Sequence, residues 1–176
     1  QRIDGCTGLS MIVDRESGRC IVTAGWESEE ALRNSADQVS PMRDRAGELF
    51  GGTPEVEVWE VAGMHRDHTS RDGACVRVTW MKGDPANADR AIDTFKLGVL
   101  PALEELEGFC SASMLIDRAT GRAVSSVTYD SVEAMRATRG QANTLRTGAS
   151  QEAGAEILDV CEFDLALAHL HVPEMV

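Results

Sequence analysis

Two stretches of the sequence, 103 positions apart, decide the fold: GCTGLSMIVDRESGRCIVTAGWESEEALR at 5–33 and GFCSASMLIDRATGRAVSSVTYDSVEAMR at 108–136. Eleven of the 29 aligned positions are identical, whereas ordinary composition gives roughly two by chance. The similarity resumes with one added residue, because WEVA at 59–62 aligns with FDLA at 163–166 and His65 aligns with His169. A repeat of this length predicts two copies of one structural unit.

The second copy has the pattern of a complete α+β unit. A helix is predicted from Asp84-Pro85 to about residue 106, and Pro101 should kink or split it. Another helix should begin after Ser131, whose hydroxyl can cap the first turn. Runs rich in apolar and β-branched residues predict strands at 75–81, 109–117, 123–130 and 156–170. The resulting order, β-α-β-β-α-β, is that of a ferredoxin-like unit.

The first copy repeats only the later part of this unit. It shows a hairpin at 9–14 and 20–26, a helix capped by Ser28 and a last strand at 55–64, but its first strand and helix are missing. A sheet without that strand would have an open edge. We therefore expect residues outside this sequence, or a partner, to supply it. The domains are predicted as a first repeat at 1–65, a linker at 66–73 and a second repeat at 74–176.

Composition narrows the range of partners. The net charge of −12 and pI near 4.7 argue against nucleic-acid binding. No apolar run approaches the roughly 18 residues of a membrane span. Five cysteines without a CxxC pair favour a reducing compartment, so the cytoplasm is the expected location.

Both copies resemble the antibiotic biosynthesis monooxygenase family. The second copy carries the resemblance in Leu106-Glu107-Gly108-Phe109, Met114, Asp117, Gly121-Arg122, Tyr129-Asp130-Ser131 and Glu133-Ala134; the first copy carries it in Ile3-Asp4-Gly5, Asp14, Gly18-Arg19, Trp26-Glu27-Ser28 and Glu30-Ala31. The resemblance implies a dimeric α/β barrel, formed here within one chain as a pseudo-dimer of two ferredoxin-like (βαββαβ) repeats. It also implies a small-molecule-binding protein. Such a protein could be a cofactor-free monooxygenase acting on an aromatic or quinol-type substrate in the cavity between the two sheets.

The candidate site residues follow from the repeat. His65 and His169 occupy equivalent positions and are the predicted acid–base groups, which would remove a proton before oxygen reacts with the substrate. The competing interpretation is that they are surface histidines at strand ends. The predicted substrate-binding residues are Trp59, Phe163, Met11, Met114 and Trp80.

Two alternatives to the oxygenase stay open. One is a non-catalytic binding or assembly module with a filled barrel, and the other is a haem-binding or haem-degrading protein. No cofactor is predicted, with haem as the alternative. The family's haem degraders carry an asparagine on the first strand, and 75–81 contains none. No metal site is predicted, because neither the HxxH at 65–68 nor the His169/His171 pair has neighbours completing four ligands. A homo-oligomer, or a partner that completes the first repeat, is also compatible with the sequence.

Overall fold

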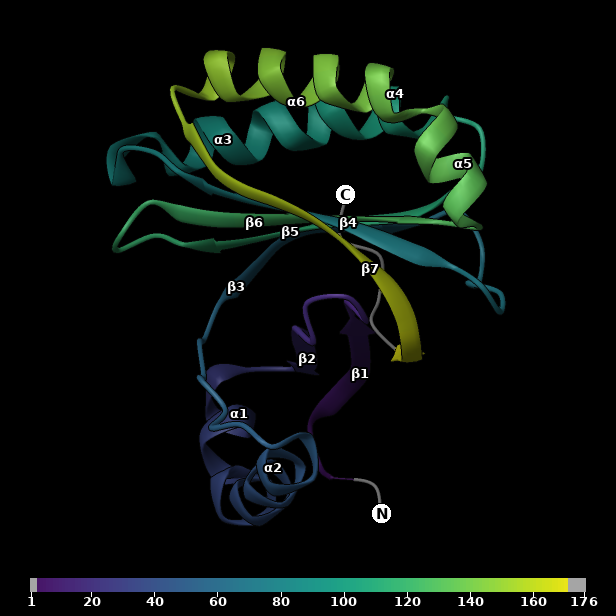
Figure 1. The fold of residues 1–176 in the computed structure, drawn as a ribbon. Coiled ribbons are helices and arrows are strands. Elements are labelled where there is room, and N and C mark those ends of the chain that lie inside the picture. Colours follow the sequence, from purple (N-terminus) through teal and green to yellow (C-terminus); the bar gives the residue numbers. More distant parts are fainter. Residues whose placement is uncertain (1–2, 171–176) are drawn as a thin grey trace.

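The computed structural model describes residues 3–170 and contains one curved antiparallel sheet with helices on two sides (Figure 1). Its strands are β1 (Cys6–Val13), β2 (Cys20–Trp26), β3 (Glu60–Arg66), β4 (Cys75–Lys82), β5 (Phe109–Asp117), β6 (Arg122–Tyr129) and β7 (Glu156–Leu170). They form a seven-stranded sheet in the order β2-β1-β7-β4-β6-β5-β3. The edges of the sheet are therefore β2 and β3.

Helices cover the two ends of this sheet. In Figure 1, α3, α4, α5 and α6 lie over β4, β6 and β5, while α1 and α2 lie at the other end, near β1 and β2. Among residues 3–170, no helix is both long and apolar enough to cross a membrane. The helical elements are α1 (Glu29–Asn34), α2 (Ala36–Phe50), η1 (Pro85–Asn87), α3 (Ala88–Thr94), the π-helical segment η2 (Phe95–Val99), α4 (Leu100–Glu104), α5 (Val132–Ala137) and α6 (Arg139–Ala153).

The elements predicted for 74–170 are confirmed, with strand ends within one residue. The predicted long helix is present as η1, α3, η2 and α4, and the π-helical segment η2 interrupts it just before Pro101, which lies in the first turn of α4. Ser131 caps α5, because its Oγ accepts a hydrogen bond from the Ala134 N–H at 3.1 Å. The strand predicted at 55–64 is wrong at its start, since β3 covers Glu60–Arg66. Residues 55–59 alternate like a strand, but β3 pairs only with β5, and that pairing begins at Glu60.

Two long-range strand pairings join the halves of the sheet in matching register. In β1·β7, Ser10 pairs with Ala168; in β3·β5, Ser113 pairs with Met64. Ser10 lies 103 positions before Ser113, and Ala168 lies 104 positions after Met64. The two pairs are therefore equivalent under the repeat. Each pairing also has an irregularity at the corresponding place, between Met11 and Ile12 in one and between Val61 and Gly63 in the other.

Strand alternation separates two hydrophobic clusters. The first faces the helices and includes Phe95, Leu103, Met114 and Tyr129. The second lies on the opposite, inner face of the sheet. Its members are Ile12, Val76, Val78, Val124 and Phe163, with Trp59 and Trp80 packed against them. The sheet therefore has two separately packed faces, one beneath the helices and one inside the curve.

Gly108 is required where the chain turns into β5. Its φ is +75°, and a Cβ there would lie 2.5 Å from the Cβ of Ala134 at the start of α5. Gly5 repeats this arrangement against Ala31, with the same φ and the same 2.5 Å approach. Close contact of the hairpin with the following helix thus excludes any side chain at both positions.

We expect Gly108→Ala to lower the free energy of unfolding by about 2–4 kcal/mol, from strain at positive φ and the clash with Ala134. The measurement is urea denaturation followed by circular dichroism. Gly140→Ala is the control, because a Cβ there meets nothing within 4 Å. It should be neutral or stabilising by up to about 1 kcal/mol. Equal unfolding midpoints for the two variants would contradict the packing argument.

Candidate functional site

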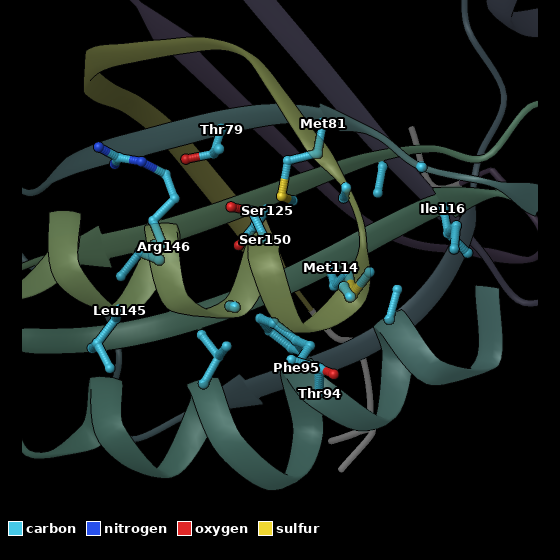
Figure 2. A pocket seen from close by; sticks show the side chains of 18 of the residues that line it. Thr79, Met81, Thr94, Phe95, Met114, Ile116, Ser125, Leu145, Arg146 and Ser150 are labelled. Atoms are coloured by element: carbon cyan, nitrogen blue, oxygen red, sulfur yellow. The ribbon is translucent and has the colours of Figure 1, made fainter. Parts of the chain in front are cut away.

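A partly enclosed cavity of about 100 Å³ lies between the sheet and the helices of the second half (Figure 2). The sheet contributes helix-facing residues of β4, β5 and β6, and the cover comes from α3, η2 and α6. This cavity is beneath the helices, whereas the sequence predicted one between two sheets.

The wall nearest β5 and η2 is apolar. Phe95, Leu103, Met114 and Ile116 line it, and each is at least nine-tenths buried. Phe95 begins the π-helical segment, and π-bulges in helices are frequent at functional sites because they reposition side chains. The wall suits the body of an apolar ligand.

The opposite side is polar. Figure 2 shows Arg146 and the hydroxyls of Thr79, Ser125 and Ser150 on one side of the cavity, with Phe95 and Met114 on the other. Among the described residues, the Arg146 guanidinium donates a hydrogen bond only to the side-chain oxygen of Asn143, at 2.5 Å. Burial, and next the positive charge of Arg77, lower the pKa of Arg146 from its ordinary value.

Arg77 is the buried centre of this polar side. Its guanidinium, 4% exposed, donates to Glu162 Oε1 at 3.0 Å, to the Met135 carbonyl at 3.0 Å and to Tyr129 Oη at 3.3 Å. Burial raises the pKa of the Tyr129 phenol, and Arg77 opposes part of that rise. Burial alone would raise the pKa of Glu162, but hydrogen bonds from Arg77 and Arg139 outweigh it and lower the pKa overall.

Charge does not balance at this end of the cavity. Two guanidiniums, Arg77 and Arg146, line this end. The Glu162 carboxylate that pairs with Arg77 is also bound by Arg139, which is not among the lining residues. An excess of positive charge in a partly buried site favours an anionic group on a ligand.

The predicted substrate-binding residues divide between the two faces of the sheet. Met114 lines the cavity. Trp59, Trp80 and Phe163 belong to the inner-face cluster, and Met11, half-buried on β1, does not line the cavity. The structure therefore does not gather these five residues into one site.

The inner-face aromatics pack with arginines instead. The Arg19 guanidinium lies 4.3 Å from the Trp80 ring centroid, and Arg122 lies 5.1 Å from that of Trp59. Arg19 and Arg122 occupy equivalent positions in the repeat. These contacts account for the conspicuous aromatic residues without a ligand.

Neither predicted histidine lines the cavity. His65 Nε2 lies 2.6 Å from Glu104 Oε1, and the imidazole stacks on Phe109 with 6.3 Å between ring centroids. His169 is exposed on β7, opposite Leu9 of β1, while His171 lies outside the described residues.

Sequence reasoning missed Arg77, Tyr129 and Arg146 as a cluster. One signal was available, since Arg77 interrupts the apolar strand sequence CVRVTWM. A charge in a buried strand requires a partner or a function. The convergence of the three residues needed the packing of α6 against the sheet.

The lining residues include no histidine or cysteine, although Met81, Met114 and Tyr129 belong to residue types that can ligate haem iron. The cavity, at about 100 Å³, is smaller than a porphyrin. Arginines and hydroxyls instead bind carboxylates, phenolates and similar oxyanions.

Two proteins of Mycobacterium tuberculosis H37Rv match the whole chain. Rv2557 is 58% identical over 176 residues, which are all of this chain and 79% of Rv2557. Rv2558 is 53% identical over 177 residues, covering all of this chain and 75% of Rv2558. Both are named uncharacterized proteins. No protein-family model matches the sequence.

Solved structures resemble the fold at low sequence identity. An anthrone oxidase-like protein superposes with a TM-score of 0.69 and 17% identity, covering 99% of this chain and 83% of that protein. A candidate monooxygenase of Lactobacillus acidophilus NCFM gives a TM-score of 0.65 at 10% identity, with coverages of 99% and 83%. A third structure, a candidate monooxygenase of Fusobacterium nucleatum, gives 0.64 at 14% identity, covering 99% and 82%. At these identities the similarity shows the fold alone.

We expect Arg77→Met to lower the free energy of unfolding at neutral pH by about 2–4 kcal/mol, because hydrogen bonds and a buried ion pair are lost. The folded pKa of Glu162 lies below its ordinary 4.5. Its stabilising contribution is therefore complete above pH 4.5 and is lost as the pH falls through the lowered value. The variant should lose less stability on acidification than the parent protein, measured as melting temperature against pH.

Arg15→Met is the matched control for that experiment. It breaks an ion pair of the same type with Asp164, but the Arg15 side chain is 75% exposed, so it should change stability little. Identical acid profiles for the parent protein and Arg77→Met would contradict the role given to Arg77.

Proposed function

We propose that the helix-covered cavity of this chain, which belongs to the family of the Mycobacterium tuberculosis proteins Rv2557 and Rv2558, binds a small aromatic molecule that carries an oxyanion. The observation that carries the proposal is the pairing of an apolar wall with a polar side where guanidiniums outnumber carboxylates. The ring would pack on Phe95 and Met114, and the oxyanion would accept hydrogen bonds from Arg146.

The cavity size limits the ligand. A dry cavity of about 150 Å³ accommodates benzene, and this one holds about 100 Å³. One ring therefore fits with a small outward movement of α6, whereas several fused rings require α3 and α6 to separate. A single-ring phenol or carboxylate is the favoured size.

The finer proposal is a cofactor-free monooxygenase of the antibiotic biosynthesis monooxygenase type, acting on a quinol. Its support is the fold shared with the anthrone oxidase-like protein and the candidate monooxygenases. The reaction balances without a cofactor, since hydroquinone and O₂ give hydroxybenzoquinone and water, and all four electrons that reduce O₂ come from the quinol. Arg146 would stabilise the phenolate, which is the form that reacts most readily with oxygen.

Proton removal by His65 or His169, predicted from the repeat, forms a separate part of this proposal. Both lie outside the cavity lining, so their action would require a water-mediated path. If the phenolate forms in solution and is selected by Arg146, His65→Ala will leave turnover unchanged. A loss of turnover with retained binding would instead make His65 the base.

We further propose that the chain is a tandem pseudo-dimer. The matched registers of β1·β7 and β3·β5 support this origin, as do two equivalent ion pairs, Arg15–Asp164 at 2.9 Å and Arg118–Glu60 at 2.7 Å.

The edge strands agree with an incomplete first repeat. In the second repeat, β4 lies between β7 and β6; the corresponding position in the first lies between β3 and β2. Among residues 3–170 no strand occupies it. Val22, on the edge strand β2, is 54% exposed. A strand and a helix added between these edges would close the barrel and cover them.

We expect benzoate to bind the protein, with Arg146→Met weakening it about tenfold or more, as for loss of a charge-assisted hydrogen bond. Benzyl alcohol, the uncharged probe of similar size, should lose little affinity in the same variant. The measurement is NMR or calorimetric titration. Equal losses for both probes would remove the oxyanion assignment, and no binding of either would remove the site.

We expect the protein to incorporate one labelled oxygen from ¹⁸O₂ into hydroquinone, detected by mass spectrometry of the product. Ala149→Trp should abolish this reaction, because Ala149 lines the cavity and an indole would fill it. Gln141→Trp places the same side chain on an exposed part of α6 and should keep the reaction. Benzoate binding without labelled product would retain the binding function and exclude the oxygenase.

A further inference from the structure

A second cluster of reactive side chains lies away from the cavity, at the end of the sheet where β5 begins. His68 follows β3, Cys110 is the second residue of β5, and Asp130 directly follows β6. Their imidazole, thiol and carboxylate ligand atoms all lie within 4.8 Å of one another. Three segments distant in sequence thus bring a nitrogen, a sulfur and an oxygen ligand together.

The backbone holds these three residues in place. The Asp67 N–H donates to the Cys110 carbonyl at 2.9 Å, and the Cys110 thiol donates to the His68 carbonyl at 3.2 Å. The Asp130 N–H donates to the Gly108 carbonyl at 2.9 Å. Cys110 is fully buried, while His68 and Asp130 are each 31% exposed. The cluster is therefore preorganised and open to solvent on one side.

Asp67 orients the imidazole of His68. Its Oδ2 lies 2.7 Å from Nδ1, and Asp130 Oδ1 lies 2.7 Å from Nε2. A carboxylate on Nδ1 fixes a proton there, so a metal ion would take the place of the Nε2 proton that now faces Asp130. A carboxylate is one of the usual acceptors for the second ring nitrogen of metal-binding histidines.

We propose that His68 Nε2, Cys110 Sγ and an Asp130 carboxylate oxygen form a binding site for Zn²⁺, with Asp67 as the carboxylate that holds the His68 tautomer. Zinc accepts this mixture of nitrogen, sulfur and oxygen ligands in tetrahedral geometry. A thiolate disfavours Mg²⁺ and Ca²⁺, which prefer oxygen ligands. Three protein ligands leave the fourth position for water.

Binding exchanges protons for the metal ion. Zn²⁺ must displace the thiol proton of Cys110 and, when the His68 imidazole is charged, its Nε2 proton as well.

The experiment is titration of the reduced, metal-free full chain with Co²⁺ as a spectroscopic probe, followed by Zn²⁺ competition. We expect one ion per chain, a thiolate-to-cobalt charge-transfer band in the near ultraviolet and loss of that band on adding Zn²⁺. Cys110→Ser should abolish the band, and His68→Asn should weaken binding at least tenfold. Asp67→Asn should weaken it about 10–100-fold, as for other outer carboxylates.

Cys161→Ser and His65→Ala are the matched controls and should bind Co²⁺ as the parent protein does. Since Cys110 is buried, circular dichroism must show that Cys110→Ser is folded; His68→Asn, at a partly exposed position, tests the same site independently. Absence of the charge-transfer band in the parent protein would overturn the proposal. So would metal binding that persists unchanged in His68→Asn.

Discussion

The pairing of β7 with two partners is the constraint on which the rest of the structure depends. This 15-residue strand runs antiparallel to β4 along its first part and to β1 along its last. It therefore belongs to the sheet of the second half and extends into that of the first, as Figure 1 shows. In the same way β3, which belongs to the first half, pairs with β5 of the second half. These two cross-pairings join the halves into one continuous sheet.

This exchange of strands fixes the two faces on which chemistry can occur. Alternation along β4 directs Val76, Val78 and Trp80 to the inner face, while Arg77, Thr79 and Met81 face the helices. A shift of register by one residue would exchange these sets. The same strand pairing therefore places the cavity on one face of the sheet and the aromatic cluster on the other.

Arg77 is a buried charge that is stable only because neighbouring groups replace its lost contact with water. A guanidinium at 4% exposure requires compensation, which comes from Glu162 on β7, Tyr129 on β6 and a backbone carbonyl before α6. Three elements must be in place before this charge is stable. The same network positions positive charge beside the cavity, so the stability of the fold and the polarity of the site are coupled.

The sequence by itself determined the local elements and the internal similarity. The Ser28 and Ser131 caps and strand periodicity are local properties, and the structure reproduces them. It also indicated an irregularity in the long helix near Pro101, because a proline cannot continue the hydrogen-bond ladder.

Only the tertiary structure decided which residues meet. Trp59, Trp80 and Phe163 are conspicuous in sequence but pack on the inner face, away from the cavity that Met114 lines. Arg77 and Arg146 come together across 69 positions of chain, as do His68 and Asp130 across 62. Such meetings depend on strand register and on how α6 crosses the sheet. No local pattern encodes them, because they result from pairing between segments distant in sequence.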